Sequence, residues 1–161
     1  MLIHDDQEQG NSQAQVSQVP ASSGDASLAV DMETLRRWAN EIPYYRFLGM
    51  NVESVSPGRA QISVRVKDDI TNGIRLAHGG VTAALIDSAV GIATISLLRG
   101  QERTVTLELK INYLAPAPRG ATLTAVGEVI HRGRTTAVGE ARVHADNGKL
   151  VAVALVTYAI L

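Results

Sequence analysis

The residues from Gly79 to Leu98 constrain this chain most, because they carry a single formal charge, at Asp87. The large apolar residues of the segment leave no clearly polar face, and a helix that is apolar all round is buried, either in a membrane or in a protein core. A buried carboxylate is costly unless it is paired or hydrogen-bonded. Asp87 is therefore the first candidate functional residue. The alternative is a core carboxylate that local hydroxyls, such as that of Ser88, satisfy.

A membrane-spanning helix is the other interpretation of the segment. Crossing a bilayer takes about 20 predominantly apolar residues, and this segment reaches that length only with Asp87 near its middle. Ionisable groups inside a membrane are rare and expensive, and strand patterns lie on both sides of the segment. We therefore expect a core helix wrapped by a sheet, and no membrane partner.

Strands are predicted on both sides of this helix, because apolar and polar residues alternate there with period two. A shorter helix, with Asp31 at its start and Pro43 at its end, precedes them. The long helix is expected to end near Arg99-Gly100, and Asp146-Asn147-Gly148 predicts a hairpin turn. The order is helix, two strands, long buried helix, four strands, which predicts an α+β fold with an antiparallel sheet curled around one central helix. The expected strands are 52–55, 60–66, 105–113, 123–131, 135–145 and 150–160.

Composition divides the chain into a tail and one domain. Residues 1–27 are rich in Gln, Ser, Asn, Asp and Gly, which predicts a disordered N-terminal tail; the domain is expected at 28–161. The first residues lack a basic stretch followed by an apolar one, so we expect no secretory signal and a cytoplasmic protein.

Disulfides, thiol nucleophiles and a metal site are not expected. The chain has no cysteine, and its four histidines do not fall at close metal-ligand spacings.

Residues 36–161 carry a net charge of +5. This charge suits an anionic small molecule, or it is simply a solvated surface. No nucleic-acid partner is expected.

Gly79 and Gly80 are predicted to begin the long helix. The first N–H groups of a helix have no internal partner and carry the positive end of its dipole. Glycine allows a ligand oxygen to approach them closely, so an anion or a polarised carbonyl could bind there. The alternative is a helix start with glycine for packing.

The distance between Gly79 and Asp87 indicates a shared site. Eight residues of helix span about 12 Å at 1.5 Å per residue, so a carbonyl bound to the Gly79 N–H is out of reach of Asp87 on the same helix. If both act on one substrate, they come from two copies of the chain, and the active site lies in a symmetric dimer. Beside them, His78 is either an acid/base or a loop-positioning residue, and Asn72 either holds the loop or contacts substrate.

These residues resemble a known family. Asn72-x5-His78-Gly79-Gly80-x6-Asp87, then Thr106-x-Glu108-x-Lys110-Ile111-Asn112-Tyr113-Leu114-x-Pro116-Ala117 and Gly133-Arg134-Thr135, are similar to the hotdog-fold acyl-CoA thioesterases, in particular to the phenylacetate-pathway (PaaI-like) branch. The resemblance runs from about Pro43 to Leu161. It implies the hotdog fold, a homodimer that often assembles into a homotetramer, and hydrolysis of an acyl-CoA thioester. No cofactor is implied, since coenzyme A is part of the substrate.

The resemblance also implies roles for single residues. The N–H matched by Gly79 polarises the thioester carbonyl, and the carboxylate matched by Asp87 of the other subunit acts as nucleophile or general base. Asn72, His78 and Thr106 match positions that orient the thioester and the water. By alternation, Thr106 is expected on the polar face of its strand, opposite Val105 and Leu107. The residues expected to bind the coenzyme A part of the substrate are Gly80, Arg119, Arg132, Gly133, Arg134 and Thr135.

Two alternatives remain open on the sequence. One is a hotdog hydratase or dehydratase with His78 as acid/base, and the other is a non-catalytic acyl-CoA-binding module. The sequence departs from the family at Ile74-Arg75-Leu76-Ala77, where members commonly have Gly and a small apolar residue. The bulky, charged Arg75 leaves the shape of the pocket open.

Overall fold

The computed structural model describes residues 31–161. The tail predicted over residues 1–27 lies outside these residues, as do the first residues of the predicted domain. The helices and strands follow in the order α1 (Met32–Asn40), α2 (Pro43–Leu48), β1 (Met50–Ser56), β2 (Arg59–Arg65), a 3-10 turn (Asp68–Ile70), α3 (Gly79–Ile95), β3 (Thr104–Tyr113), β4 (Thr122–Arg132), β5 (Thr136–Ala145) and β6 (Leu150–Ile160).

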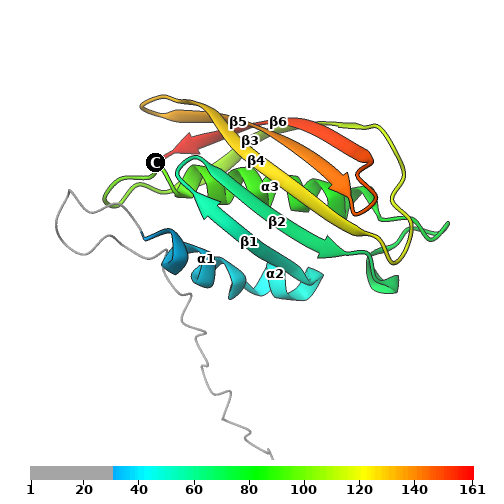
Figure 1. Cartoon of the computed structure of the whole chain (residues 1–161). Coiled ribbons are helices and arrows are strands. Elements are labelled where there is room, and N and C mark those ends of the chain that lie inside the picture. The colour runs from blue at the N-terminus through cyan, green and yellow to red at the C-terminus, as the bar shows by residue number, and fades with distance from the viewer. Residues whose placement is uncertain (1–30) are drawn as a thin grey trace, which may run out of the picture.

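The strands form one six-stranded sheet in the order β1-β2-β4-β5-β6-β3, and every neighbouring pair is antiparallel (Figure 1). The α+β fold with an antiparallel sheet around a central helix, predicted from the sequence, is confirmed. β1 and β3 are the edges of this sheet.

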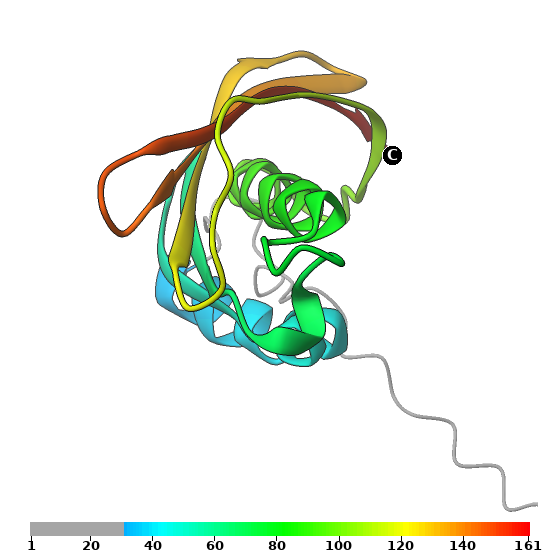
Figure 2. The same cartoon turned by 90° about the vertical axis from the view of Figure 1, so that its right-hand side faces the viewer.

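The sheet curls over α3, which lies in its concave side (Figure 2). Close approach depends on two glycines. A Cβ at Gly127 of β4 would lie 2.5 Å from the backbone carbon of Ala89, and one at Gly139 of β5 would lie 2.5 Å from Val90 Cγ1. Since real Cβ atoms do not come so near, these glycines allow the sheet to contact the helix directly.

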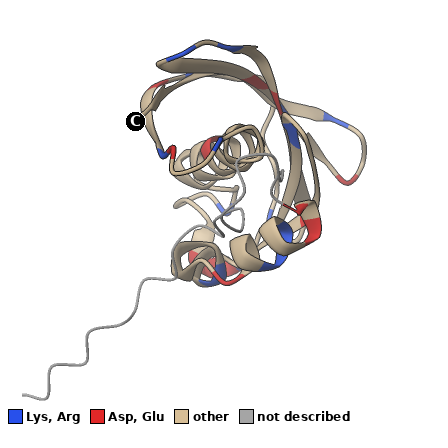
Figure 3. Cartoon of the chain, turned by 90° about the vertical axis from the view of Figure 1, so that its left-hand side faces the viewer, with Lys and Arg blue, Asp and Glu red and all other residues tan. Residues whose placement is uncertain are grey.

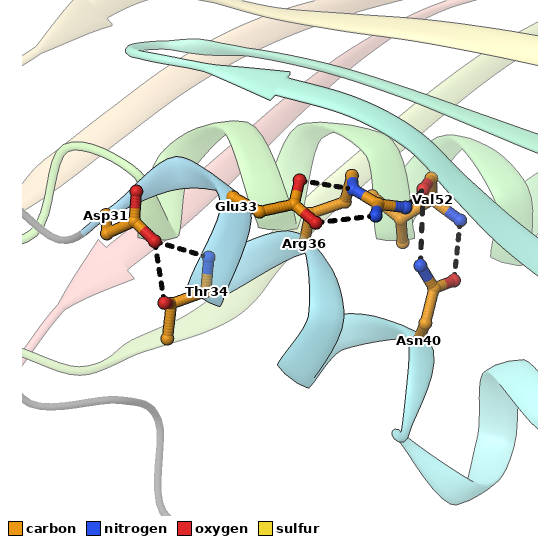
Figure 4. Close-up of polar contacts among 6 residues, drawn as sticks. All are labelled: Asp31, Glu33, Thr34, Arg36, Asn40 and Val52. Atoms are coloured by element: carbon orange, nitrogen blue, oxygen red, sulfur yellow. Dashed lines mark hydrogen bonds and ion pairs between the residues drawn. The ribbon is translucent and has the colours of Figure 1, made fainter.

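The two short helices cover the β1 side of the molecule (Figures 1 and 2). Asp31 is the N-cap of α1 and accepts a hydrogen bond from Thr34 N at 2.8 Å, as the sequence predicted. Asn40 ties the end of α1 to β1 through Val52, accepting from Val52 N at 2.8 Å and donating to Val52 O at 3.2 Å (Figure 4).

The role expected of Pro43 was wrong. α1 ends at Asn40, and Pro43 is the first residue of α2, because its fixed φ suits the first turn of a helix.

α3 is shorter than the sequence predicted. It ends at Ile95 rather than near Arg99-Gly100, and no basic residue lies in its last turn. One stripe along it, Ala84, Asp87, Gly91 and Ile95, is only half-buried within the chain. The helix therefore has an incompletely covered face, and Asp87 lies on it.

Charged residues of both signs are interspersed over the strands and the short helices (Figure 3). Among the described residues, no helix is long and apolar enough to cross a membrane.

Candidate active site

The first turn of α3 begins with a histidine cap. His78 is extended (φ −63°, ψ 136°), and its Nδ1 accepts a hydrogen bond from the Gly80 N–H at 2.9 Å. A ring that accepts at Nδ1 carries its proton on Nε2. A Cβ at Gly80 would lie 3.0 Å from this Nδ1, so glycine makes room for the cap. His78 thus positions the helix start in this structure.

Gly79 is left with a free donor. The Gly80 N–H is occupied by His78, whereas within residues 31–161 the N–H of Gly79 has no hydrogen-bond partner. A Cβ at Gly79 would make only an ordinary contact, 3.5 Å from the Tyr113 hydroxyl. Packing within the chain therefore does not require glycine here, and the N–H is open to a ligand atom.

Asn72 shapes the loop in front of this helix. Its Oδ1 accepts hydrogen bonds from Ile74 N and Leu76 N, both at 3.1 Å. Arg75 between them has a positive φ of 60°, in the left-handed region that favours glycine. The Arg75 side chain is exposed and does not line the cavity at Gly79.

That cavity has a volume of about 320 Å³. Asn72, Gly79 and Thr82 contribute to its wall, together with Tyr113 from β3. The Tyr113 hydroxyl donates a hydrogen bond to Gly79 O at 2.9 Å, which fixes the C-terminal end of β3 against the start of α3.

Asp87 lies at a second site, two turns along the helix. Its Oδ1 accepts hydrogen bonds from Thr106 Oγ1 at 2.9 Å and from the Tyr158 hydroxyl at 2.7 Å. The donors come from β3 and β6, not from Ser88 as the alternative interpretation suggested. The half-buried carboxylate is therefore held by two hydroxyls from adjacent strands.

A β-bulge brings Thr106 to this position. The register between β3 and β6 shifts between Thr106 and Glu108, so that Thr106 opposes Tyr158 and Glu108 opposes Thr157. The extra residue, Leu107, reverses the alternation, and a bulge is known to re-aim a side chain in this way. The expectation that Thr106 shares the face of Glu108 and Lys110 was therefore wrong: Thr106 faces α3 of its own chain.

Two tyrosines lie close to Asp87 in apolar surroundings. Burial, and secondarily the negative charge of Asp87, raises the pKa of Tyr45 to about 12. The same two causes, burial first, raise the pKa of Tyr158 well above its usual value. Both phenols therefore stay protonated. Neither tyrosine was singled out from the sequence, although Tyr158 lies on the inward face of the last strand by simple alternation with Val156.

A second cavity, of about 280 Å³, opens at this carboxylate, with Tyr45, Asp87, Thr106 and Tyr158 among its lining residues. One chain thus carries two candidate sites, a free helix N–H and a held carboxylate, about 12 Å apart along α3. The expected separation of Gly79 from Asp87 follows directly from the helix Gly79–Ile95.

The basic residues predicted to bind coenzyme A divide between the two ends of the molecule. Arg119 pairs with Asp68 at 2.5 Å, next to the loop before α3. Arg132 pairs with Glu102 and donates to Gly133 O at 2.8 Å. Arg134, in the β4–β5 turn with Thr135, forms no ion pair with any residue of the described chain. Among residues 31–161, no group of three or more His, Cys, Asp or Glu residues could hold a metal ion.

Known proteins are similar to this chain over most of its length. Residues 75–152 match the family described as thioesterase superfamily. Human acyl-coenzyme A thioesterase 13 is 29% identical over 122 residues, which cover 74% of this chain and 86% of that protein. The structure of PaaI from the phenylacetic acid degradation operon of E. coli superposes with a TM-score of 0.74 at 26% identity, covering 80% of this chain and 91% of that one. A variant of the phenylacetic acid degradation protein PaaI from Thermus thermophilus superposes with a TM-score of 0.70 at 31% identity, covering 74% of this chain and 100% of that one.

Proposed function

Since the chain belongs to the thioesterase superfamily and is a thioester hydrolase, we propose that its substrates are acyl-CoA thioesters, which it cleaves to the free acid and coenzyme A. Its similarity to human acyl-coenzyme A thioesterase 13 supports this substrate class. The fold is the hotdog arrangement that the resemblance implied.

The observation that carries the mechanism is the Asp87 carboxylate at a cavity. Oδ1 is occupied by Thr106 and Tyr158, whereas Oδ2 forms no hydrogen bond within residues 31–161. A carboxylate with one free oxygen at a cavity is suited to attack the thioester carbon or to accept a proton from an attacking water. We assign Asp87 this role.

Gly79 is the second part of the proposed machinery. Its unpartnered N–H at the positive end of α3 can stabilise the oxyanion that develops on the thioester oxygen. Asn72 and His78 act by holding this donor in place, because one shapes the loop and the other caps the helix. The proposal gives His78 no proton-transfer step, since its Nδ1 is engaged by Gly80.

A homodimer through β3 would combine the two candidate sites, so that the Gly79 N–H and the Asp87 carboxylate become the half-sites of one shared active site. β3 is an edge strand of ten residues, with Val105 and Leu107 half or more exposed, and long apolar edges are templates for pairing. Antiparallel pairing about a two-fold axis near Leu109 would bring Tyr113 of one chain beside Thr106 of its partner. Tyr113 contacts Gly79 and Thr106 contacts Asp87, so the free N–H would meet the carboxylate of the partner subunit.

The coenzyme A part of the substrate is proposed to lie along two groups of residues that contain arginine and lie in turns. Arg119 lies near the Gly79 half-site and Arg132, Gly133, Arg134 and Thr135 near the opposite end of β4. In the shared site, these two groups would come from different subunits. A pairing of dimers into a tetramer remains part of the proposal, on the resemblance alone.

The test is release of free thiol from a panel of acyl-CoAs with aryl, short, medium and long acyl groups, followed with a thiol reagent. We expect hydrolysis of at least one class, with free acid formed in equal amount. A folded protein that releases no coenzyme A above the uncatalysed rate from any member would contradict the proposed substrate class.

A further inference from the structure

The hydroxyl of Tyr158 has two acceptors, both belonging to Asp87. It lies 2.6 Å from the backbone carbonyl oxygen of Asp87 and 2.7 Å from its Oδ1. Because a phenol has one proton, this group donates to one acceptor at a time. The side chain of Tyr158 is 4% exposed, so the contact is enclosed by the protein.

Tyr158 and Thr106 act on the same carboxylate oxygen. They are directly opposed in the register between β3 and β6, and both hydroxyls contact Oδ1 while Oδ2 is left without a hydrogen bond among the described residues. We propose that Tyr158 is a positioning residue for the hydrolysis: together with Thr106 it anchors Oδ1 of Asp87 and so presents Oδ2 as the reacting oxygen. This inference rests on the role proposed above for Asp87.

Asp87 Oδ2 can act in either of two ways, as a nucleophile or as a general base. As a nucleophile, Oδ2 bonds to the thioester carbon, the C–S bond breaks with release of the thiolate, and water then hydrolyses the resulting anhydride to regenerate the carboxylate. As a general base, Oδ2 takes a proton from the water that attacks the same carbon, the C–S bond then breaks, and the proton passes from Oδ2 to the departing thiolate. In both, a carboxylate that rotates freely about its Cβ–Cγ bond spends less time in the productive orientation.

The tyrosine is a donor throughout the working pH range, because burial and the Asp87 charge raise the pKa of its phenol. Tyr45, from α2, also faces this pair, and its raised pKa likewise keeps it neutral. Asp87 therefore faces two neutral phenols, of which Tyr158 contacts its side chain.

Gly91 leaves space for the hydroxyl of Tyr158 beside α3. It lies one helical turn after Asp87, and a Cβ there would be 3.1 Å from the Tyr158 hydroxyl oxygen but 3.6 Å from the ring carbon Cζ. The first distance is tighter than ordinary contacts and the second is normal. A methyl group at position 91 would thus displace the hydroxyl while tolerating a ring without one.

The first experiment compares Tyr158→Phe with the wild type on the best acyl-CoA of the panel. We expect kcat to fall about tenfold or more, with KM and the thermal midpoint nearly unchanged, because only the orientation of Oδ2 is lost. An unchanged kcat, or a raised KM at unchanged kcat, would overturn the positioning role. A wild type that hydrolyses nothing would instead reject the proposed substrate class.

A double-mutant cycle supplies the matched control. Gly91→Ala alone should lower kcat, whereas in the Tyr158→Phe background it should add almost nothing, because the atom it displaces is already gone. Additive losses would show that Gly91→Ala acts by another route and would overturn the assignment. If Tyr158→Phe folds poorly, Gly91→Ala alone still tests the assignment, and an unchanged kcat in that variant would overturn it.

Crystal structures give a measurement that needs no substrate. In Tyr158→Phe we expect the Asp87 carboxylate to leave its wild-type orientation or to occupy several. A carboxylate that stays in the wild-type orientation would overturn the proposal.

Discussion

At the scale of single residues, the chain separates groups that hold the site from groups free to react. His78 and Asn72 accept hydrogen bonds from backbone N–H groups of the loop and the first helical turn. The Gly79 N–H and Asp87 Oδ2 have no such partner among the described residues. This division favours hydrolysis at Asp87 over a hydratase that would need His78 as acid/base. Similarity to a protein named as an acyl-coenzyme A thioesterase favours an enzyme over the non-catalytic module.

Asp87→Asn tests the carboxylate with little change of shape. The amide oxygen can accept the hydrogen bonds of Thr106 and Tyr158, so the fold should be kept, but the reacting oxygen becomes an amide nitrogen. We expect kcat to fall by roughly 10² or more, measured as thiol release, with an unchanged far-UV circular dichroism spectrum. Wild-type turnover by the folded variant would refute the mechanism.

The exposed arginines should act on the coenzyme A part alone. Arg119→Ala and Arg134→Ala are each expected to raise KM for acyl-CoA about 3- to 10-fold, since a charge-assisted contact to phosphate is lost. A short thioester of N-acetylcysteamine, which lacks the nucleotide, should be hydrolysed by both variants at the wild-type rate. Equal losses on the two substrates would argue against this assignment.

At the scale of elements, the bulge in β3 decides what the site contains. Without it, the alternation would turn Thr106 away from α3 and leave Asp87 with Tyr158 as its one donor from the sheet. The turn before β3 is itself fixed to the end of β4 by the ion pair between Glu102 and Arg132, whose side chains are 28% and 18% exposed. This pair therefore links the start of β3 to the hairpin that carries Arg134.

Glu102→Gln should reveal that link as a pH-dependent loss of stability. Hydrogen bonding to Arg132 lowers the pKa of Glu102 in the folded state, so the pair stabilises the fold above the unfolded pKa of about 4.3 and loses this contribution as the pH falls through the folded value. At pH 7 we expect a loss of about 1 kcal/mol in the free energy of unfolding, measured with urea.

The difference from wild type should shrink as the pH is lowered below about 4. Glu128→Gln is the control, because Glu128 is exposed on β4 and forms no ion pair with any other described residue. A Glu102→Gln loss that does not depend on pH would mean that the side chain acts by packing rather than by charge.

At the scale of the whole molecule, one chain is an incomplete enzyme in this proposal. The half-sites lie on the incompletely covered face of α3 and beside the free edge of β3. A second copy on that edge would cover both and supply the missing group to each. Activity should therefore depend on pairing of chains that each retain one half-site.

Complementation between two inactive variants tests this directly. Gly79→Pro removes the N–H at the first helical position, where proline is tolerated, and His78 before it already has the extended backbone that precedes proline. Asp87→Ala removes the carboxylate. Each variant alone should be inactive. Refolded together at equal amounts, they should recover about one quarter of wild-type activity, because half the dimers are mixed and each mixed dimer has one intact site.

Mixed dimers are counted by native mass spectrometry. If they form and activity is not recovered, Gly79 and Asp87 do not serve one site across the interface. If Gly79→Pro does not fold, Gly79→Val takes its place, since its bulk blocks the approach to the same N–H.

The sequence by itself determined the central helix and the strands, and it singled out the two positions that are proposed to react. Periodicity marks the strands because side chains alternate across a sheet, and Gly79 and Asp87 stand out because a helix start and a lone carboxylate in an apolar helix are local features. The distance between them also follows from sequence, since the rise of a helix is fixed.

Only the tertiary structure decided what surrounds these positions. The donors to Asp87 lie 19 and 71 residues away along the chain, and which strands meet there depends on sheet order. The bulge at Leu107 was invisible to alternation, because one inserted residue reverses the faces without changing the composition. Tyr158 reaches Asp87 because Gly91 leaves space for its hydroxyl, a fit that arises only when α3 packs against the sheet.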